Sequence, residues 1–199
     1  MEGRMPMELL LTLGRTLGFS LAAGVNLYAT VAVLGLAARY QWVALPPQYQ
    51  VFADPWVIGI ALALYAVEFV ADKVPWVDTV WDAAHTVIRP LGGALVAVTA
   101  LGEASPALMA LMAVTGGTVA AGSHLAKAGT RVAVNASPEP FSNWAVSLGE
   151  DAFVVTLGLL ALSHPLAALA VTLGALFGIA LALRWIWTRL KAPRLLDSA

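Results

Sequence analysis

Cysteine is absent from this chain, which excludes disulfide bonds, a thiolate nucleophile and a cysteine-ligated metal. Charged residues are scarce as well: they make up 12% of the chain, whereas a soluble domain contains about 25%. The net charge of -1 gives no basic surface that would attract a nucleic acid. No HExxH, P-loop or GxSxG motif occurs. We therefore predict no catalytic residue, no cofactor and no nucleic-acid partner.

Apolar residues form most of the chain. They account for 60% of it, and the mean hydropathy is +0.81. A transmembrane helix needs about 20 such residues in a row. Six segments approach this length: residues 16–38, 55–72, 88–104, 106–126, 144–163 and 165–187. The sequence therefore predicts an all-α integral membrane protein with six transmembrane helices, in a single membrane domain over residues 1–199.

The basic residues indicate an orientation. If the N-terminus lies inside and the chain crosses six times, ten of the eleven Lys and Arg residues fall on the inner side. Only Arg39 then falls outside, which is a strong positive-inside bias. Trp185 and Trp187 lie close to basic residues, as in an interfacial anchor. We expect a multi-pass protein of the inner (cytoplasmic) membrane with both termini in the cytoplasm.

One short stretch, residues 68–90, carries a dense set of ionisable groups in this apolar chain. Four of them have the spacing i, i+4, i+7 and i+11, which places them on one face of a helix. Pro75 is expected to separate this helix from the preceding one. The candidate binding residues here are Glu68, Asp72, Lys73, Asp78, Asp82 and His85, and Arg89 completes the helical face.

Two interpretations of this face remain open. It is either the wet side of an amphipathic helix at the membrane surface or a buried site, because ionisable groups inside a membrane are costly and mark ion or substrate pathways. Glu68 follows a run without charge, residues 55–67, which favours burial. Asp82 and His85 could also ligate a metal together with Glu68 or Asp78. An isolated Asp-His pair is weak evidence for such a site, and we predict no metal.

The two halves of the chain resemble each other. Residues 22–27 (AAGVNL) match residues 120–125 (AAGSHL), and residues 89–93 (RPLGG) resemble residues 164–168 (HPLAA). An acid lies between these landmarks in each half, Glu68 in the first and Glu150 with Asp151 in the second. We predict an inverted three-plus-three repeat, with repeat 1 at about 7–104 and repeat 2 at about 105–190. Such repeats meet at a midplane site in many secondary transporters.

The first segment of each half is longer than a simple span. Residues 7–40 and 105–135 each carry a glycine and a polar residue near the middle. This pattern predicts a broken or re-entrant helix whose free backbone groups bind something polar. Close helix packing by small residues is the alternative. We place Asn26, Tyr28 and His124 in the candidate site.

The second half has its own polar cluster. Lys127 and Arg131 are spaced i, i+4, so the two cations repel each other unless an anion lies between them. Either the acids of the first half neutralise them in a structural ion network, or they hold an anionic head group such as a phosphate. Glu150 could carry protons together with Glu68. The candidate binding residues here are Lys127, Arg131, Asn135, Glu150 and Asp151.

Several of these motifs resemble a family of bacterial membrane proteins known as domain of unknown function 4126. The matching elements are Ala-Gly-x-Asn-x-Tyr-Ala-Thr at residues 23–30 and Glu-x-x-x-Asp-Lys-x-Pro-x-x-Asp at residues 68–78. Two more are Arg-Pro-x-Gly-Gly at residues 89–93, and His-x-x-Lys-x-x-x-Arg with the later Ser-Pro-Glu-Pro at residues 124–140. Leu27 departs from the proline expected after the asparagine. The resemblance implies an integral membrane fold in a bacterial inner membrane, and no activity.

Three functional hypotheses follow. The first is a small secondary transporter or flippase, coupled to protons, for a small or lipid-linked anionic substrate. The second is a membrane enzyme acting on a lipid or isoprenoid head group through Asp78, Asp82 and His85. The third is a non-catalytic scaffold whose ion network sets the helix register. Membrane lipids are expected partners, and close-packing glycines such as Gly174 and Gly178 suit a homodimer.

Overall fold

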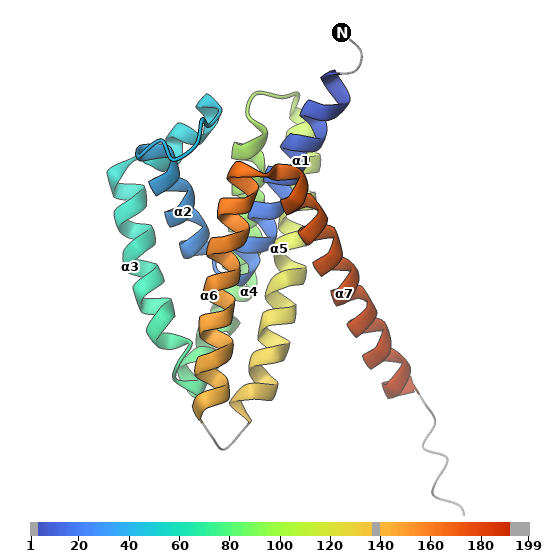
Figure 1. The fold of residues 1–199 in the computed structure, drawn as a ribbon. Coiled ribbons are helices and arrows are strands. Elements are labelled where there is room, and N and C mark those ends of the chain that lie inside the picture. Colours follow the sequence, from blue (N-terminus) through green and yellow to red (C-terminus); the bar gives the residue numbers. More distant parts are fainter. Residues whose placement is uncertain (1–3, 137–139, 192–199) are drawn as a thin grey trace, which may run out of the picture.

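The computed structural model describes residues 4–136 and 140–191, and this part of the chain is helical without any strand. Figure 1 shows the helices as an elongated bundle with α7 leaning out from it. The elements are α1 (Arg4–Val25), α2 (Leu27–Arg39), the 3₁₀ helix η1 (Pro47–Ala53), α3 (Pro55–Ala71), α4 (Pro75–Leu101), α5 (Pro106–Asn135), α6 (Pro140–Ser163) and α7 (Pro165–Lys191).

Several helices have the length and composition of membrane spans, which makes this a multi-pass membrane protein, as the sequence predicts. Five described helices qualify, namely α1, α4, α5, α6 and α7. A sixth span is possible if η1 and α3 count together, although they meet at a bend of 61°. The predicted number of six spans is therefore not confirmed. At 13 residues, α2 is too short to cross a bilayer on its own.

Proline sets where most of these helices begin. Each of the helices from α3 to α7 starts with a proline at its first position. That position suits proline, because the first N–H of a helix has no intrahelical partner. Asp54 and Ser105 cap α3 and α5 by accepting hydrogen bonds from backbone N–H groups in the first turn. Prolines at five positions thus mark helix starts in the fold.

The first long apolar segment is broken at Asn26, as the sequence predicts. Asn26 has extended backbone angles and accepts a hydrogen bond from Ala29 N through its side chain, so it is the N-cap of α2. Its side chain faces Asp151 in the middle of α6. On either side of this point the chain returns toward the end of α6, because Gly14 packs against Pro165 and Val33 packs at Gly158. Helices α1 and α2 therefore form a re-entrant hairpin.

The hairpin forms the core of the bundle. The apolar window of α1 is 56% buried, compared with 11% for that of α7. Small residues allow this close packing: a Cβ on Gly24 would meet Ala120 and Ser123 of α5, and one on Gly93 of α4 would meet Ala120. The Ser123 hydroxyl also donates a hydrogen bond to Leu21 O at 3.0 Å. This contact fixes the depth of α1 against α5.

The inverted repeat of the two halves is not confirmed. Helix α5 is continuous through His124, so the prediction of a broken first helix in the second half is wrong. Pro90 lies inside α4, whereas its supposed counterpart Pro165 begins α7. Figure 1 shows α1 and α5 running in the same direction, although the repeat requires opposite directions. Of the two matching segments, Gly24 in α1 packs against Ala120 and Ser123 of α5, whereas a Cβ at Gly122 in α5 would have no heavy atom within 4 Å.

The ends of the described chain lie at opposite ends of the bundle. Figure 1 shows α1 beginning at one end and α7 finishing at the other. The expectation that both termini lie in the cytoplasm is not confirmed, and it counts the first segment as a complete crossing. A re-entrant hairpin returns to the side from which it enters, so it adds no crossing. Five helices, α3 to α7, then connect the two ends.

Candidate functional site

A buried set of charged side chains links the helices near the α3–α4 turn. We call it the ion-pair network. The side chains of its members are at most 15% exposed. Its face on α4 points inward, so the interpretation of that face as a solvated surface is wrong. The members are Glu68 (α3), Asp72 (C-cap of α3), Asp78, Asp82 and Arg89 (α4), Lys127 and Arg131 (α5), and Glu150 (α6).

Arg89 connects three helices from a fully buried position. Its Nη2 donates to Glu68 Oε1 at 2.6 Å, and its Nη1 donates to Asp82 Oδ1 at 3.0 Å. The same Nη1 donates to His124 Nδ1 at 2.7 Å, while the other ring nitrogen of His124 hydrogen-bonds Thr86 Oγ1. A guanidinium suits this place because it is always charged and donates in several directions of one plane. One arginine thus joins α3, α4 and α5.

Lys127 and Arg131 lie one turn apart on α5 and share carboxylates. Lys127 Nζ is 2.8 Å from Asp72 Oδ2 and 3.5 Å from Glu68 Oε1. It is also 3.6 Å from Glu150 Oε2. Arg131 Nη2 donates to Asp72 Oδ2 at 3.0 Å and to Glu150 Oε2 at 2.8 Å. The two cations tolerate each other because Asp72 and Glu150 lie between them.

Amide side chains close the network at the α5–α6 end. Asn135 Nδ2 donates to Asp78 Oδ2 at 2.6 Å, and Arg131 Nε lies 4.0 Å from Asp78 Oδ1. Asn143 Nδ2 donates to Asn135 Oδ1. Its own side-chain oxygen accepts from Arg131 Nη1 at 3.0 Å. Asp78 and Asn135, both predicted site residues, are therefore joined to the cations of α5.

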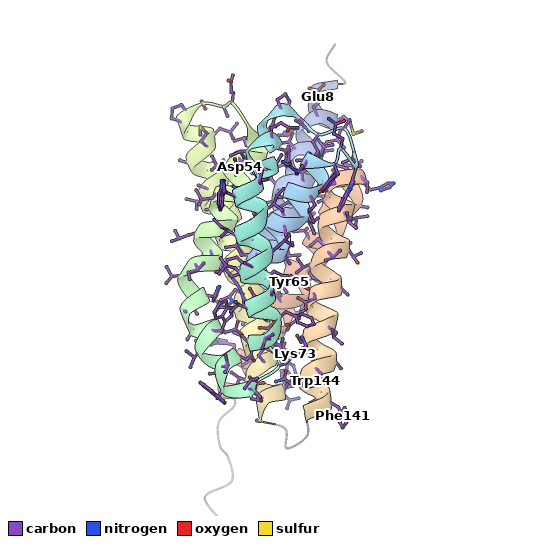
Figure 2. The ribbon with its side chains drawn as sticks, turned by 90° about the vertical axis from the view of Figure 1, so that its left-hand side faces the viewer. Glu8, Asp54, Tyr65, Lys73, Phe141 and Trp144 are labelled. Carbon is purple, nitrogen blue, oxygen red and sulfur yellow. The ribbon has the colours of Figure 1, made fainter. Side chains whose placement is uncertain are left out.

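Lys73 lies in the α3–α4 turn, near the end of the bundle that carries Trp144 and Phe141 (Figure 2). Its Nζ is 3.1 Å from the centroid of the Phe69 ring and donates to Ser147 Oγ at 3.3 Å. Burial lowers the pKa of Lys73, while the carboxylates of Asp151 and Asp72 act in the opposite direction. The structure places this predicted site residue at the rim of the network, with no ion pair among the described residues.

The tip of the re-entrant hairpin reaches the residue next to Glu150. Asn26 Nδ2 donates to Asp151 Oδ1 at 3.2 Å, and both side chains are buried. The second carboxylate oxygen of Asp151 has no hydrogen-bond partner. Asn26 thus caps α2 with its oxygen and binds α6 with its nitrogen. Any shift of the hairpin must break or move this contact.

Tyr28 and His85 form a separate pair at the start of α2. Tyr28 OH hydrogen-bonds His85 Nε2 at 3.0 Å, and His85 Nδ1 hydrogen-bonds Trp81 O at 2.7 Å. Both ring nitrogens of His85 are therefore hydrogen-bonded, and Asp82 accepts a hydrogen bond from Arg89. Over residues 4–136 and 140–191, no group of three or more His, Asp or Glu side chains could hold a metal. The geometry gives no support to a metal set at Asp82 and His85.

Acids outnumber bases in the ion-pair network. It contains five carboxylates and three cations, so an excess of two negative charges remains if every member is ionised and the histidines are neutral. Burying uncompensated charge is expensive. Carboxylate oxygens of Glu68, Asp72, Asp78 and Asp82 also lack hydrogen-bond partners. If all members are ionised, the described network therefore buries negative charge and carboxylate oxygens that its three cations do not satisfy.

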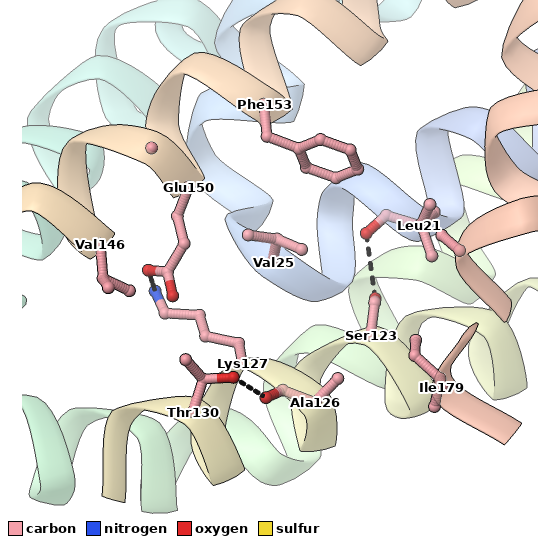
Figure 3. Close-up of a pocket in the computed structure, with 12 residues that line it drawn as sticks. Leu21, Val25, Ser123, Ala126, Lys127, Thr130, Val146, Glu150, Phe153 and Ile179 are labelled. Atoms are coloured by element: carbon pink, nitrogen blue, oxygen red, sulfur yellow. Dashed lines mark hydrogen bonds and ion pairs between the residues drawn. The ribbon is translucent and has the colours of Figure 1, made fainter. Parts of the chain in front are cut away.

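A cavity of about 370 Å³ opens beside the network between α1, α5, α6 and α7. Figure 3 shows the Lys127–Glu150 ion pair on one side of it, with Phe153 and Val25 above. The Glu150 side chain is 15% exposed, more than any other carboxylate in the salt bridges, where the range is 0% to 7%. Glu150 and Lys127 thus both line the cavity, whereas their partner Arg131 does not.

Every member of the ion-pair network except Arg89 is among the predicted binding residues. Arg89 was recognised as part of the α4 face and was not chosen as a site residue, although it binds Glu68 and Asp82. Its spacing of seven residues from Asp82 was the available signal. Asn143 is also absent from the predicted site residues. It lies in a polar stretch, and no local pattern indicates that this stretch contacts Arg131.

Comparisons with known proteins agree with the motif resemblance. Neither the curated proteins nor the solved structures contain a match to this chain. A sequence profile described as "Domain of unknown function (DUF4126)" matches residues 13–185, a region that includes the hairpin, the network and the cavity. The chain belongs to this family, domain of unknown function 4126.

Proposed function

We propose that this protein is a proton-coupled secondary transporter or flippase of the bacterial inner membrane that carries a substrate with an anionic group. The observation that supports it best is the position of Glu150. This carboxylate lines the cavity and at the same time occupies both cations of α5, at 2.8 Å from Arg131 and 3.6 Å from Lys127. A substrate anion that enters the cavity must compete with Glu150 for these cations.

That competition supplies the coupling. When Glu150 is ionised, Lys127 and Arg131 are neutralised by the protein's own carboxylates, and an incoming anion would add to an existing excess of negative charge. When Glu150 takes up a proton, its ion pairs weaken and the cations can bind the anion. Proton and anion then bind together and leave together. This linkage of binding gives symport when the loaded site opens to the other side of the membrane.

The re-entrant hairpin provides a moving part. Broken helices whose ends meet at the substrate site are typical of secondary transporters. Here the tip at Asn26 binds Asp151, whose neighbour is Glu150. A change in the charge of this segment of α6 can therefore alter the position of the hairpin. The mechanism requires no internal repeat.

We place the end of the bundle with the α3–α4 turn in the cytoplasm. The α3–α4 turn with Lys73 and the last turns of α7 with the exposed Arg184 and Arg189 lie toward this end (Figure 1). The end of α2 with Arg39 and the part of α1 with Arg15 lie toward the other. The start of α1 is then on the periplasmic side and the end of α7 in the cytoplasm. This proposal replaces the expectation of two cytoplasmic termini.

Transport by purified protein in liposomes tests the proposal. Liposomes with trapped pyranine and an imposed inward proton gradient are exposed in turn to inorganic phosphate, glycerol 3-phosphate and lysophosphatidic acid. We expect protein-dependent acidification with at least one of them. The rate should fall roughly tenfold in Glu150→Gln, a factor within the range that coupling between two sites typically gives. Glu103→Gln, an exposed acid in the α4–α5 turn, is the matched control. Equal rates in wild type and Glu150→Gln would overturn the coupling role.

A structural scaffold is the second candidate, because all three cations of the network already have carboxylate partners. In that case only the pairing matters and not the exchange of protons. Exchanging the charges in the double variant Asp72→Lys with Lys127→Asp would then restore stability and leave every cellular phenotype intact. A stable double variant without proton-coupled uptake would favour the transporter.

A further inference from the structure

A second cavity extends from the first along the membrane-facing side of the bundle. It has a volume of about 660 Å³ and lies between α5 and α7. The two cavities share four lining residues, so they form one continuous groove. We call it the α5–α7 groove. The shared residues are Ala126, Thr130, Ala175 and Ile179.

The two ends of this groove differ in chemistry. At its inner end lie Lys127 and Glu150, with the hydroxyls of Ser123 and Thr130 beside them. Along its outer part the lining consists of apolar side chains and glycines, with Thr130 as the remaining polar residue. An occupant that matches both ends must carry a charged group attached to a long apolar chain.

The groove opens because α7 leans away from α5 (Figure 1). Gly122 and Gly129 on α5, and Gly178 on α7, line it, and a Cβ at any of the three would have no heavy atom within 4 Å. These glycines therefore do not mediate close helix packing here. At the lower end of α7, Arg184 and Arg189 are exposed, and Arg189 lies 5.4 Å from the Trp185 ring. Exposed arginines at this level attract anionic lipid head groups.

We propose that the α5–α7 groove binds the acyl chain of a phosphate-bearing bilayer lipid, whose head group enters sideways to reach Lys127 behind Glu150. This inference rests on the proposed function and names its substrate class. A lipid satisfies the apolar outer part with its chain and the cations with its phosphate. A second copy of this chain would cover the apolar part but would leave the inner ion pair without a ligand. A water-soluble anion would leave the apolar part empty.

Photocrosslinking in nanodiscs tests this assignment directly. The probe is lysophosphatidic acid with a diazirine near the end of its acyl chain, and the readout is the peptide that carries the label. We expect labelling of α5 around residues 122–130 and of α7 around residues 175–186. Excess unlabelled lysophosphatidic acid should abolish the labelling, whereas inorganic phosphate and uncharged monoacylglycerol should not.

Filling the groove is the critical variant. Gly129→Leu with Gly178→Leu places two side chains in open space, so the fold tolerates them, and labelling should fall roughly tenfold or more. Gly59→Leu is the matched control, because Gly59 is exposed on α3 with equally open surroundings and lines neither cavity. Equal melting temperatures of the three proteins exclude misfolding as the cause.

Labelling elsewhere on the bundle would overturn the proposal, and so would unchanged labelling in the filled variant. A filled variant that changes from dimer to monomer would also overturn it, because the groove would then be a contact between copies. The result separates this inference from the proposed function. If the wild-type protein shows no specific labelling but retains Glu150-dependent uptake of glycerol 3-phosphate, the lipid site is wrong and the transporter proposal stands. Specific labelling without any Glu150-dependent flux would leave the lipid site and overturn the transporter proposal.

Discussion

Asn26 and His124 occupy the same place in two matching hexapeptides, yet one ends a helix and the other lies inside one. Asn26 uses its short side chain to cap the next helix at Ala29 and to bind Asp151. His124 keeps a helical backbone and uses its ring to reach Arg89 and Thr86 on α4. The comparison teaches that the same short pattern can occupy different environments, and that a local cap decides whether the helix ends.

The largest expected effect lies on the His124 side of this comparison. Arg89→Met removes the cation that holds two buried carboxylates, so we expect unfolding to become easier by about 3–5 kcal/mol. Arg184→Met, an exposed arginine on α7, should change stability by no more than about 0.5 kcal/mol. Unfolding in mixed micelles of increasing dodecyl sulfate content, followed by circular dichroism, measures both. Similar curves for the two variants would show that the network does not stabilise the bundle.

A smaller effect is expected at the break. Asn26→Ala removes a cap that contributes about 1 kcal/mol, and it leaves Asp151 without its amide partner, which costs about 1–3 kcal/mol more. Ser105→Ala is the matched variant, because Ser105 caps α5 at an exposed site and binds no acid. The same unfolding assay compares them. If both variants lose the same stability, the contact between the hairpin tip and α6 has no energetic role.

The smallest effect tests the two glycines of the matching hexapeptides. Gly24→Ala forces a Cβ into Ala120 and Ser123, so we expect a loss of about 1–3 kcal/mol. Gly122→Ala meets nothing within 4 Å and should gain up to about 1 kcal/mol through helix propensity. Opposite signs in the unfolding assay would confirm that the hexapeptides share a sequence and differ in environment. Stability changes of the same sign in both variants would contradict this difference in environment.

Much of the site could be predicted because local rules govern it. The spacing of Asp78, Asp82 and Arg89 fixes one helical face, and the absence of charge before Glu68 indicates burial. The pairing could not be predicted, because it depends on which helices become neighbours. Arg131 reaches Asn143 only because α6 folds back along α5.

The sequence by itself determined that this is a helical membrane protein, and it predicted a helix break both near Asn26, where there is one, and near His124, where there is none. Composition, prolines at first helical positions and a capping side chain are local properties, and they act whatever the rest of the chain does. Only the tertiary structure decided that α2 turns back alongside α1 and that Arg89 binds acids from two helices. A cap ends a helix but sets no direction for the next one; packing against α4, α5 and α6 does.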